Sequence, residues 1–199
     1  MFKDMADFGM DDEELEQMYQ EVILDAARDP HGRVGDQADG REDSDGDGVT
    51  IRVEHEACLA AESHQFNPTC GDQATIHVEV APGEQGGQDL IQRIVWQGSG
   101  CSISQASLSI MVDLVQGQTV DHAMDLAADF RKLMESRGAG IEDEKAQDAL
   151  GDAMVFQGVS KYPMRIKCAL LGWEGMKASV AQALSARRED DKDEKEEQA

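Results

Sequence analysis

Four stretches of the chain carry apolar residues at helical spacing, which gathers them on one face of a helix. They cover residues 11–29, 103–114, 120–134 and 168–184. The first opens with acidic residues, which suit a helix N-terminus, and stops before Pro30. Gly117 can end the second in a left-handed conformation. We therefore predict one early helix and a block of three later ones.

Shorter alternating runs between the first two predicted helices indicate strands, because successive side chains of a strand point to opposite faces. Their apolar positions are Ile51 and Val53, then Ile76, Val78 and Val80, then Leu90, Ile94 and Trp96. Strands followed by a block of helices predict an α+β fold. We expect a small antiparallel three-stranded sheet with helices packed on one face.

Four polar segments lack this periodicity. Residues 1–10 are expected to be a flexible N-terminus, and the acidic, glycine-rich stretch 36–48 a mobile insertion. Residues 136–152 are acidic and weakly patterned, which indicates a second insertion. Residues 187–199 are almost wholly charged and are expected to be disordered, because they cannot bury enough apolar surface to offset their ordering entropy. One domain over residues 11–186 remains.

The charge balance limits the classes of partner. The 199 residues include 18 Lys and Arg against 41 Asp and Glu, a formal net charge of −23. So acidic a surface repels phosphate backbones and anionic lipid headgroups, and we expect neither a nucleic acid nor a membrane partner. The N-terminus lacks the apolar stretch of a secretory signal, and no segment reaches membrane-spanning length. We therefore expect a soluble cytoplasmic protein.

Chemistry is expected at the cysteines, which lie at positions 58, 70, 101 and 168. In a reducing cytosol, cysteines are more often metal ligands, nucleophiles or buried apolar residues than disulfide partners. Cys70 lies in a turn containing Pro and Gly, and Asp72 follows closely enough for both side chains to reach one metal ion. Cys101 directly precedes a predicted helix, whose dipole favours a thiolate. Cys168 begins another predicted helix beside two basic residues.

Three thiolates and one carboxylate form a four-coordinate sulfur and oxygen set that zinc accepts. The spacings between these cysteines, 31 and 67 residues, match no local zinc motif. Residue types alone therefore leave two interpretations open, a metal site or buried structural thiols.

Three segments of the chain resemble those of a known family. NPTCGD at 67–72, GSGCSIS at 98–104 and GVSKYPMRIKCALLGW at 158–173 are similar, in this order, to the signature segments of SufU proteins, which are relatives of the IscU scaffold. Two features resemble SufU more than IscU. Lys167 stands before the last cysteine, where IscU proteins have a histidine, and residues 136–157 add an insertion that IscU lacks.

The resemblance implies a zinc-dependent sulfurtransferase that accepts persulfide sulfur from a SufS-type cysteine desulfurase and passes it to a SufBCD-type scaffold. The implied ligands of Zn2+ are Cys70, Asp72, Cys101 and Cys168. Cys70 would also be the catalytic sulfur acceptor, with Arg165 and Lys167 as supporting residues. The alternative is an IscU-like scaffold that assembles a 2Fe–2S cluster on the same ligands.

Other conspicuous residues are expected to be structural. Cys58 lies outside the three segments and fits a small buried residue. The histidines are scattered and fit surface or strand-face positions, although His64 is close enough to Cys70 in sequence to approach the site. Trp96 and Trp173 fall in apolar patterns and should anchor the core.

An acidic loop matches the D-x-D-x-D-G-x5-E pattern of calcium-binding loops. The matching residues are Asp43, Asp45, Asp47, Gly48 and Glu54. However, Thr50 falls where such loops prefer an apolar residue, and a strand-like run rather than a helix follows. We therefore expect a solvated loop without tight calcium binding.

Overall fold

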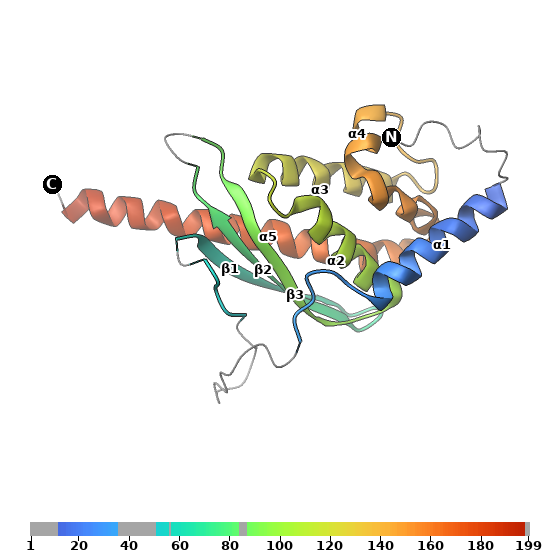
Figure 1. Cartoon of the computed structure of the whole chain (residues 1–199), viewed down its shortest axis with the longest axis horizontal. Helices are drawn as coiled ribbons and strands as arrows, with labels where there is room; N and C mark the ends of the chain where they lie inside the picture. The colour runs from blue at the N-terminus through green and yellow to red at the C-terminus, as the bar shows by residue number, and fades with distance from the viewer. Residues whose placement is uncertain (1–11, 36–50, 56, 84–86, 198–199) are drawn as a thin grey trace.

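The computed structural model describes residues 12–35, 51–55, 57–83 and 87–197, with the backbone alone described beyond Arg187. One helix is followed by three strands and then by a block of helices (Figure 1), which confirms the α+β fold. The predicted flexible N-terminus and the acidic insertion at 36–48 lie outside the described residues.

The three strands pair in chain order as an antiparallel sheet, as predicted. They are β1 (Leu59–Asn67), β2 (Asp72–Ala81) and β3 (Leu90–Ser99). The inner side chains of the central strand β2 are fully buried against the helices, and these are Ala74, Ile76, Val78 and Val80. The alternating runs in the sequence therefore predicted β2 and β3 correctly.

The prediction of the first strand at Ile51 and Val53 is wrong, because both residues lie in an irregular segment. Strand β1 begins at Leu59 and pairs with β2 along its whole length, up to the partners Asn67 and Asp72. The sequence of β1, LAAESHQFN, contains no β-branched residue and does not alternate cleanly between buried and exposed positions. Its strand conformation depends on pairing with β2, which a pattern within one segment does not reveal.

The helices cover one face of the sheet. Helices α1 (Asp12–Arg28), α2 (Ser102–Val115) and α3 (Val120–Glu135) confirm three of the predicted helices. The last helix, α5 (Pro163–Glu197), packs against β1 and β2, while α2 packs against α5 and β3 (Figure 1). Within the described part of the chain, no helix is long and apolar enough to cross a bilayer.

Both tryptophans are buried in the core, as predicted. Trp96 lies on β3, and Trp173 lies on α5, where its ring stacks on Phe130 of α3 with a centroid distance of 4.7 Å. Stacked rings of this kind stabilise the contact beyond the burial of their area. The aromatic pair therefore joins two helices of the block.

The predicted insertion at 136–152 contains regular structure. Helix α4 covers Glu144–Leu150, and the 3-10 helix η3 covers Gly151–Lys161. Ala146 and Leu150 are buried although most of their neighbours are polar. These apolar positions are too few to predict a helix from periodicity, and contact with α3 and η3 completes the burial.

Helix α5 is longer at both ends than predicted. It begins at Pro163 rather than at Cys168, because proline suits the first turn of a helix, where its missing N–H is not needed. Its described backbone continues to Glu197, beyond the predicted end at residue 184. Glu, Lys and Arg are good helix formers, and extending an existing helix requires no new nucleus.

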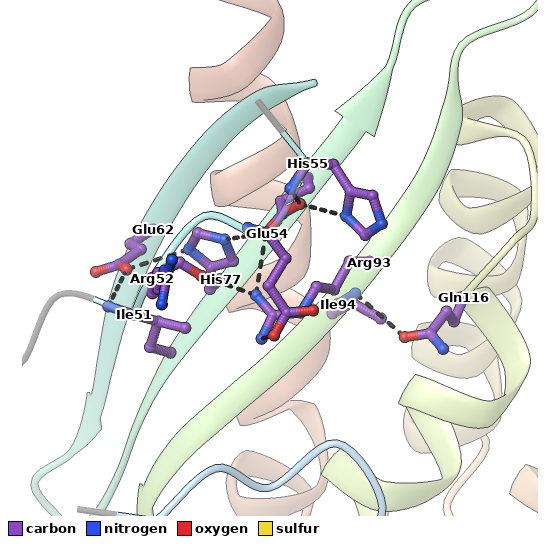
Figure 2. Close-up of polar contacts among 10 residues, drawn as sticks. Ile51, Arg52, Glu54, His55, Glu62, His77, Arg93, Ile94 and Gln116 are labelled. Atoms are coloured by element: carbon purple, nitrogen blue, oxygen red, sulfur yellow. Dashed lines mark hydrogen bonds and ion pairs between the residues drawn. The ribbon is translucent and has the colours of Figure 1, made fainter. Parts of the chain in front are cut away.

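The other face of the sheet carries a polar cluster that we call the Glu79 cluster, made of Glu79, His55, His77, Glu62 and Arg93. Figure 2 labels four of these residues, His55, His77, Glu62 and Arg93. The Glu79 carboxylate is fully buried and accepts hydrogen bonds from the backbone N–H groups of Glu54 and His55, each at 2.8 Å. It also contacts Arg93 Nη1 at 3.0 Å and His55 Nδ1 at 2.7 Å. These contacts hold the segment 51–55 on the sheet.

His77 extends the Glu79 cluster across β2 to β1. Its Nε2 lies 3.2 Å from Glu79 Oε1, and its Nδ1 lies 3.1 Å from Glu62 Oε1. Glu62 in turn accepts the N–H of Ile51 at 2.6 Å. His77 is a strand-face residue, one of the two positions expected for the histidines, and it is buried.

Candidate metal centre

Cys70 is carried outward by the tight turn between β1 and β2. The N–H of Gly71 donates to the carbonyl of Asn67 at 2.9 Å, and the N–H of Thr69 donates to the Asn67 side-chain Oδ1 at 3.1 Å. Gly71 has a φ of 79°, a left-handed conformation that favours glycine. The turn exposes the Cys70 thiol.

Asp72 and Cys101 are joined by two contacts. Asp72 opens β2 and is buried, and its Oδ1 accepts the N–H of Cys101 at 3.1 Å. Cys101 is the N-cap of α2, as predicted, and its Sγ lies 3.3 Å from Asp72 Oδ2. A Cβ on Gly100 would overlap Ser104 Oγ and press on Asp72, so glycine permits this close approach.

Cys168 is the buried sulfur of the site, with 4% of its surface exposed. Its Sγ lies 3.2 Å from the Sγ of Cys70 and 3.6 Å from the side-chain amide nitrogen Nδ2 of Asn67. Because α5 begins at Pro163, Cys168 does not begin a helix. The prediction that a helix begins at Cys168 is therefore wrong, and the thiol lies inside the helix rather than at its N-terminus.

Together, these contacts bring the four predicted side chains into one site. Ligand atoms of Cys70, Asp72 and Cys168 all lie within 4.8 Å of one another. Cys101 joins the group through its contact with Asp72. The strands, α2 and α5 thus gather residues that are far apart in the sequence.

The site has a strong electrostatic asymmetry. Burial, together with contacts to Cys70 and Asp72, raises the pKa of the Cys168 thiol far above its usual range. Burial also raises the pKa of Asp72, but hydrogen bonds from Cys168, Cys70 and Cys101 outweigh it and lower the pKa overall. The carboxylate therefore stays ionised, and a cation among the sulfurs would offset the cost of ionising the thiols.

The donor set fits a metal that accepts soft ligands. Three sulfurs and one carboxylate oxygen match the tetrahedral coordination of zinc, and thiolates also bind the irons of iron–sulfur clusters. Cys70, Asp72, Cys101 and Cys168 would hold the ion. Cys70 and Cys101 are exposed, whereas Cys168 is buried. The site therefore combines metal-binding groups with an exposed nucleophile.

The predicted supporting residues lie outside this group. Arg165 is exposed and stacks over the Tyr162 ring, with its guanidinium carbon 4.8 Å from the ring centroid. Lys167 is also exposed. Among the described residues, neither makes a hydrogen bond or ion pair with the four site side chains. His64 is exposed and contacts Thr75 Oγ1 at 3.0 Å, so it does not join the site.

Two further candidates from the sequence are Cys58 and the acidic calcium-like loop. Cys58 lies just before β1, is partly buried and is outside the metal-binding group, in keeping with its exclusion. The calcium-loop residues at 43–48 fall outside the described residues. Glu54, which would complete that loop, is paired instead with Arg93 Nη2 at 2.8 Å.

Sequence reasoning missed Asn67 as a residue of the site. Its signal was present, because an Asn side chain often accepts the backbone N–H two residues ahead in a turn. The contact with Cys168 was not predictable from that rule, since Cys168 lies on a distant helix.

Comparisons with known proteins show the family to which the chain belongs. The family described as NifU-like N terminal domain matches residues 18–169. The chain is 36% identical over 115 residues to the zinc-dependent sulfurtransferase SufU of Bacillus subtilis (strain 168), covering 58% of this chain and 71% of that protein. It is 35% identical over 130 residues to the iron–sulfur cluster assembly scaffold protein IscU of Streptococcus pyogenes serotype M1, covering 65% and 75%.

A solved structure shows the same fold. It is that of a protein proposed as an iron–sulfur cluster assembly scaffold for the SUF system of Fervidobacterium islandicum AW-1, with a TM-score of 0.56 and 24% identity. The match covers 82% of this chain and 97% of that one. The described sheet and helices therefore form a known architecture.

Proposed function

Because the chain belongs to the NifU-like N-terminal domain family of iron–sulfur cluster assembly proteins, we propose that it is a zinc-dependent sulfurtransferase that accepts persulfide sulfur from a SufS-type cysteine desulfurase. One observation carries the proposal: the exposed thiol of Cys70 lies 3.2 Å from the buried Cys168 within a set of metal-binding groups. A carrier of sulfur needs one accessible nucleophile, and a metal site needs retained ligands. This arrangement supplies both.

The transfer step is a nucleophilic substitution at sulfur. The Cys70 thiolate attacks the terminal sulfur of the desulfurase persulfide, and a new S–S bond forms at Cys70. The S–S bond within the desulfurase persulfide breaks, and the desulfurase cysteine leaves as a thiolate. The proton on the terminal sulfur stays with it, so no external oxidant or reductant is needed. A SufBCD-type scaffold is the proposed recipient of the sulfur.

The four side chains have different roles in the proposed transfer. When bound, zinc supplies positive charge that keeps the thiols of the site ionised. Asp72 and Cys168 are buried donors suited to retention of the ion. Cys70 stands on the outer turn, where a partner can reach it. Asp72 also holds the N–H of Cys101 and so fixes the start of α2 beside the site.

The decisive experiment locates the transferred sulfur. The chain is incubated with purified desulfurase and cysteine, and its persulfides are alkylated and mapped by mass spectrometry. We expect persulfide on Cys70, none on the Cys70→Ser variant, and an unchanged yield on the control Cys58→Ser. We expect Asp72→Ala to retain zinc less well and to transfer less sulfur. Persulfide on Cys101 or Cys168 of the wild type, with Cys70→Ser still active, would refute the assigned roles.

A second candidate function is a scaffold for a 2Fe–2S cluster, because the relative in Streptococcus pyogenes is named as a scaffold and thiolates bind iron as well as zinc. Metal analysis and the visible spectrum of the purified chain separate the two. A zinc site is colourless, whereas an iron–sulfur cluster absorbs visible light. Stoichiometric iron with the corresponding absorption would favour the scaffold.

A further inference from the structure

Two sulfurs of the site lie so close together that both are in reach of the same incoming sulfane sulfur. The Sγ atoms of Cys70 and Cys168 are 3.2 Å apart. A sulfane sulfur delivered to one is within reach of the other. Burial protects Cys168 from large reagents, but it does not distinguish two neighbouring sulfurs once the donor sulfur has arrived. For the persulfide to form on only one of them, the two sulfurs must also differ in nucleophilicity.

Asn67 contacts Cys168 and the turn that carries Cys70. It is buried, and its partner across the β1–β2 ladder is Asp72. The backbone N–H of Thr69 is a donor, so the side-chain atom that faces it at 3.1 Å must be the acceptor Oδ1. The other end of the amide is then the NH2 group, and it faces Cys168 Sγ at 3.6 Å. The backbone therefore fixes which end of the amide meets the sulfur.

We propose that Asn67 is a positioning residue that makes the two sulfurs unequal. Its Nδ2 donates a hydrogen bond to Cys168 Sγ, which draws electron density from that sulfur and weakens it as a nucleophile. Its Oδ1 holds the turn that carries Cys70 outward. One amide thus restrains Cys168 as a retained donor and presents Cys70 as the acceptor. This inference rests on the proposed sulfur chemistry, but it concerns the thiols themselves.

Two substitutions separate the two ends of the amide. Asn67→Ser keeps a hydroxyl that can accept the Thr69 N–H in the same kind of turn, but it is too short to replace the donor to Cys168. Asn67→Ala removes both contacts. Gln65→Ala is the matched control, because Gln65 lies on the same strand and its amide donates to Ser63 rather than to a sulfur.

The thiols are tested with inorganic polysulfide, which needs no desulfurase. A thiolate attacks a sulfane sulfur, and a shorter polysulfide leaves. Zinc-loaded chains are treated briefly, alkylated and mapped by mass spectrometry, and their zinc content is measured in parallel. We expect the ratio of Cys168 to Cys70 persulfide to rise about tenfold in Asn67→Ser, the effect of losing one hydrogen bond to a charged group. We expect at least this rise in Asn67→Ala, which also loses the turn contact. We expect no change in Gln65→Ala.

The outcomes are separable. A wild-type ratio in Asn67→Ser would show that the donor to Cys168 is not needed, and it would overturn the proposal. Loss of zinc without a change in the modified cysteine would also overturn it, because Asn67 would then serve only the metal site. If polysulfide gives the expected ratios but the desulfurase transfers no sulfur, the proposed function fails and the role of Asn67 stands.

Discussion

Strand β2 carries a buried carboxylate at each end, and the two have opposite surroundings. Glu79 is fully buried, but the chain itself surrounds it with Arg93, His55 and His77. Asp72 is almost as deeply buried, and its neighbours are three thiols that become negative when ionised. One end of the strand is thus paired within the fold, whereas we propose that the other receives a cation from outside.

The histidine in the Glu79 cluster makes the contrast sharper. Both ring nitrogens of His77 face carboxylate oxygens, one of Glu62 and one of Glu79. The His77 ring therefore links a carboxylate of β1 to one of β2. Two backbone N–H groups of the segment 51–55 donate to the Glu79 carboxylate and hold this segment in place. The difference teaches that buried charge is structural where the chain supplies the counter-ion and functional where it does not.

The largest expected effect follows from metal removal at the cysteine end. A ligand at about 1,000 times its Kd stabilises the native state by about 4 kcal/mol, and we expect a comparable loss on chelation of zinc. For a chain of this size, that is a fall in Tm of about 8–16 °C. Calorimetry with and without chelator measures it.

Variants at the cysteines check that this stabilisation comes from the site. Cys101→Ser should lose most of its zinc and with it the response to chelator, whereas Cys58→Ser should keep both. Equal Tm values with and without chelator in the zinc-loaded wild type would show that a bound cation does not stabilise the Asp72 end of β2.

The next effect is at the Glu79 end. Removing one partner of a buried ion pair leaves the other charge uncompensated, so we expect Glu79→Gln to reduce the free energy of unfolding by about 3 kcal/mol. Urea denaturation with an unchanged m-value would measure this loss. Zinc content should not change. A loss below about 1 kcal/mol would mean that the cluster contributes little beyond its surface contacts.

Acid should weaken the Glu79 cluster in a defined range. Hydrogen bonds from Glu54, His55 and His77 outweigh the opposing effect of burial and lower the pKa of Glu79 from 4.5 to about 2. Because the folded-state pKa is depressed, the stabilisation is fully present above about pH 4.5 and is lost as the pH falls toward 2.

We expect this group to account for about 2 kcal/mol of lost stability by about pH 3. The measurement compares the pH dependence of unfolding in wild type and Glu79→Gln, both without metal so that the cysteine site does not contribute. Parallel curves over this range would show that Glu79 is not the group that titrates.

The smallest effect is expected at the rim of the Glu79 cluster. The Glu54 side chain is 58% exposed and pairs with Arg93 at 2.8 Å. Exposed pairs contribute little, so Glu54→Gln should cost less than about 1 kcal/mol. The backbone N–H of Glu54 would still donate to Glu79. Calcium should leave the Tm unchanged in both the wild type and Glu54→Gln. A rise in Tm with calcium in the wild type that is absent in Glu54→Gln would support calcium binding by the loop.

The sequence by itself determined the parts of the protein whose cause is local. Apolar periodicity predicted α1, α2, α3, β2 and β3. The turn residues around Cys70 and the glycine before Cys101 marked two of the cysteine segments, and the resemblance to SufU proteins joined Cys168 to them. These signals lie within short stretches of chain, where spacing and backbone preference leave a pattern.

Only the tertiary structure decided the features that depend on distant partners. Strand β1 forms because β2 offers a ladder, and α4 because its two buried residues find contacts outside their own segment. The amide of Asn67 meets Cys168 across 101 positions of sequence, and Glu79 meets His55 and Arg93 from two other segments. Burial and charge pairing act between groups brought together by folding, so no pattern within one segment records them.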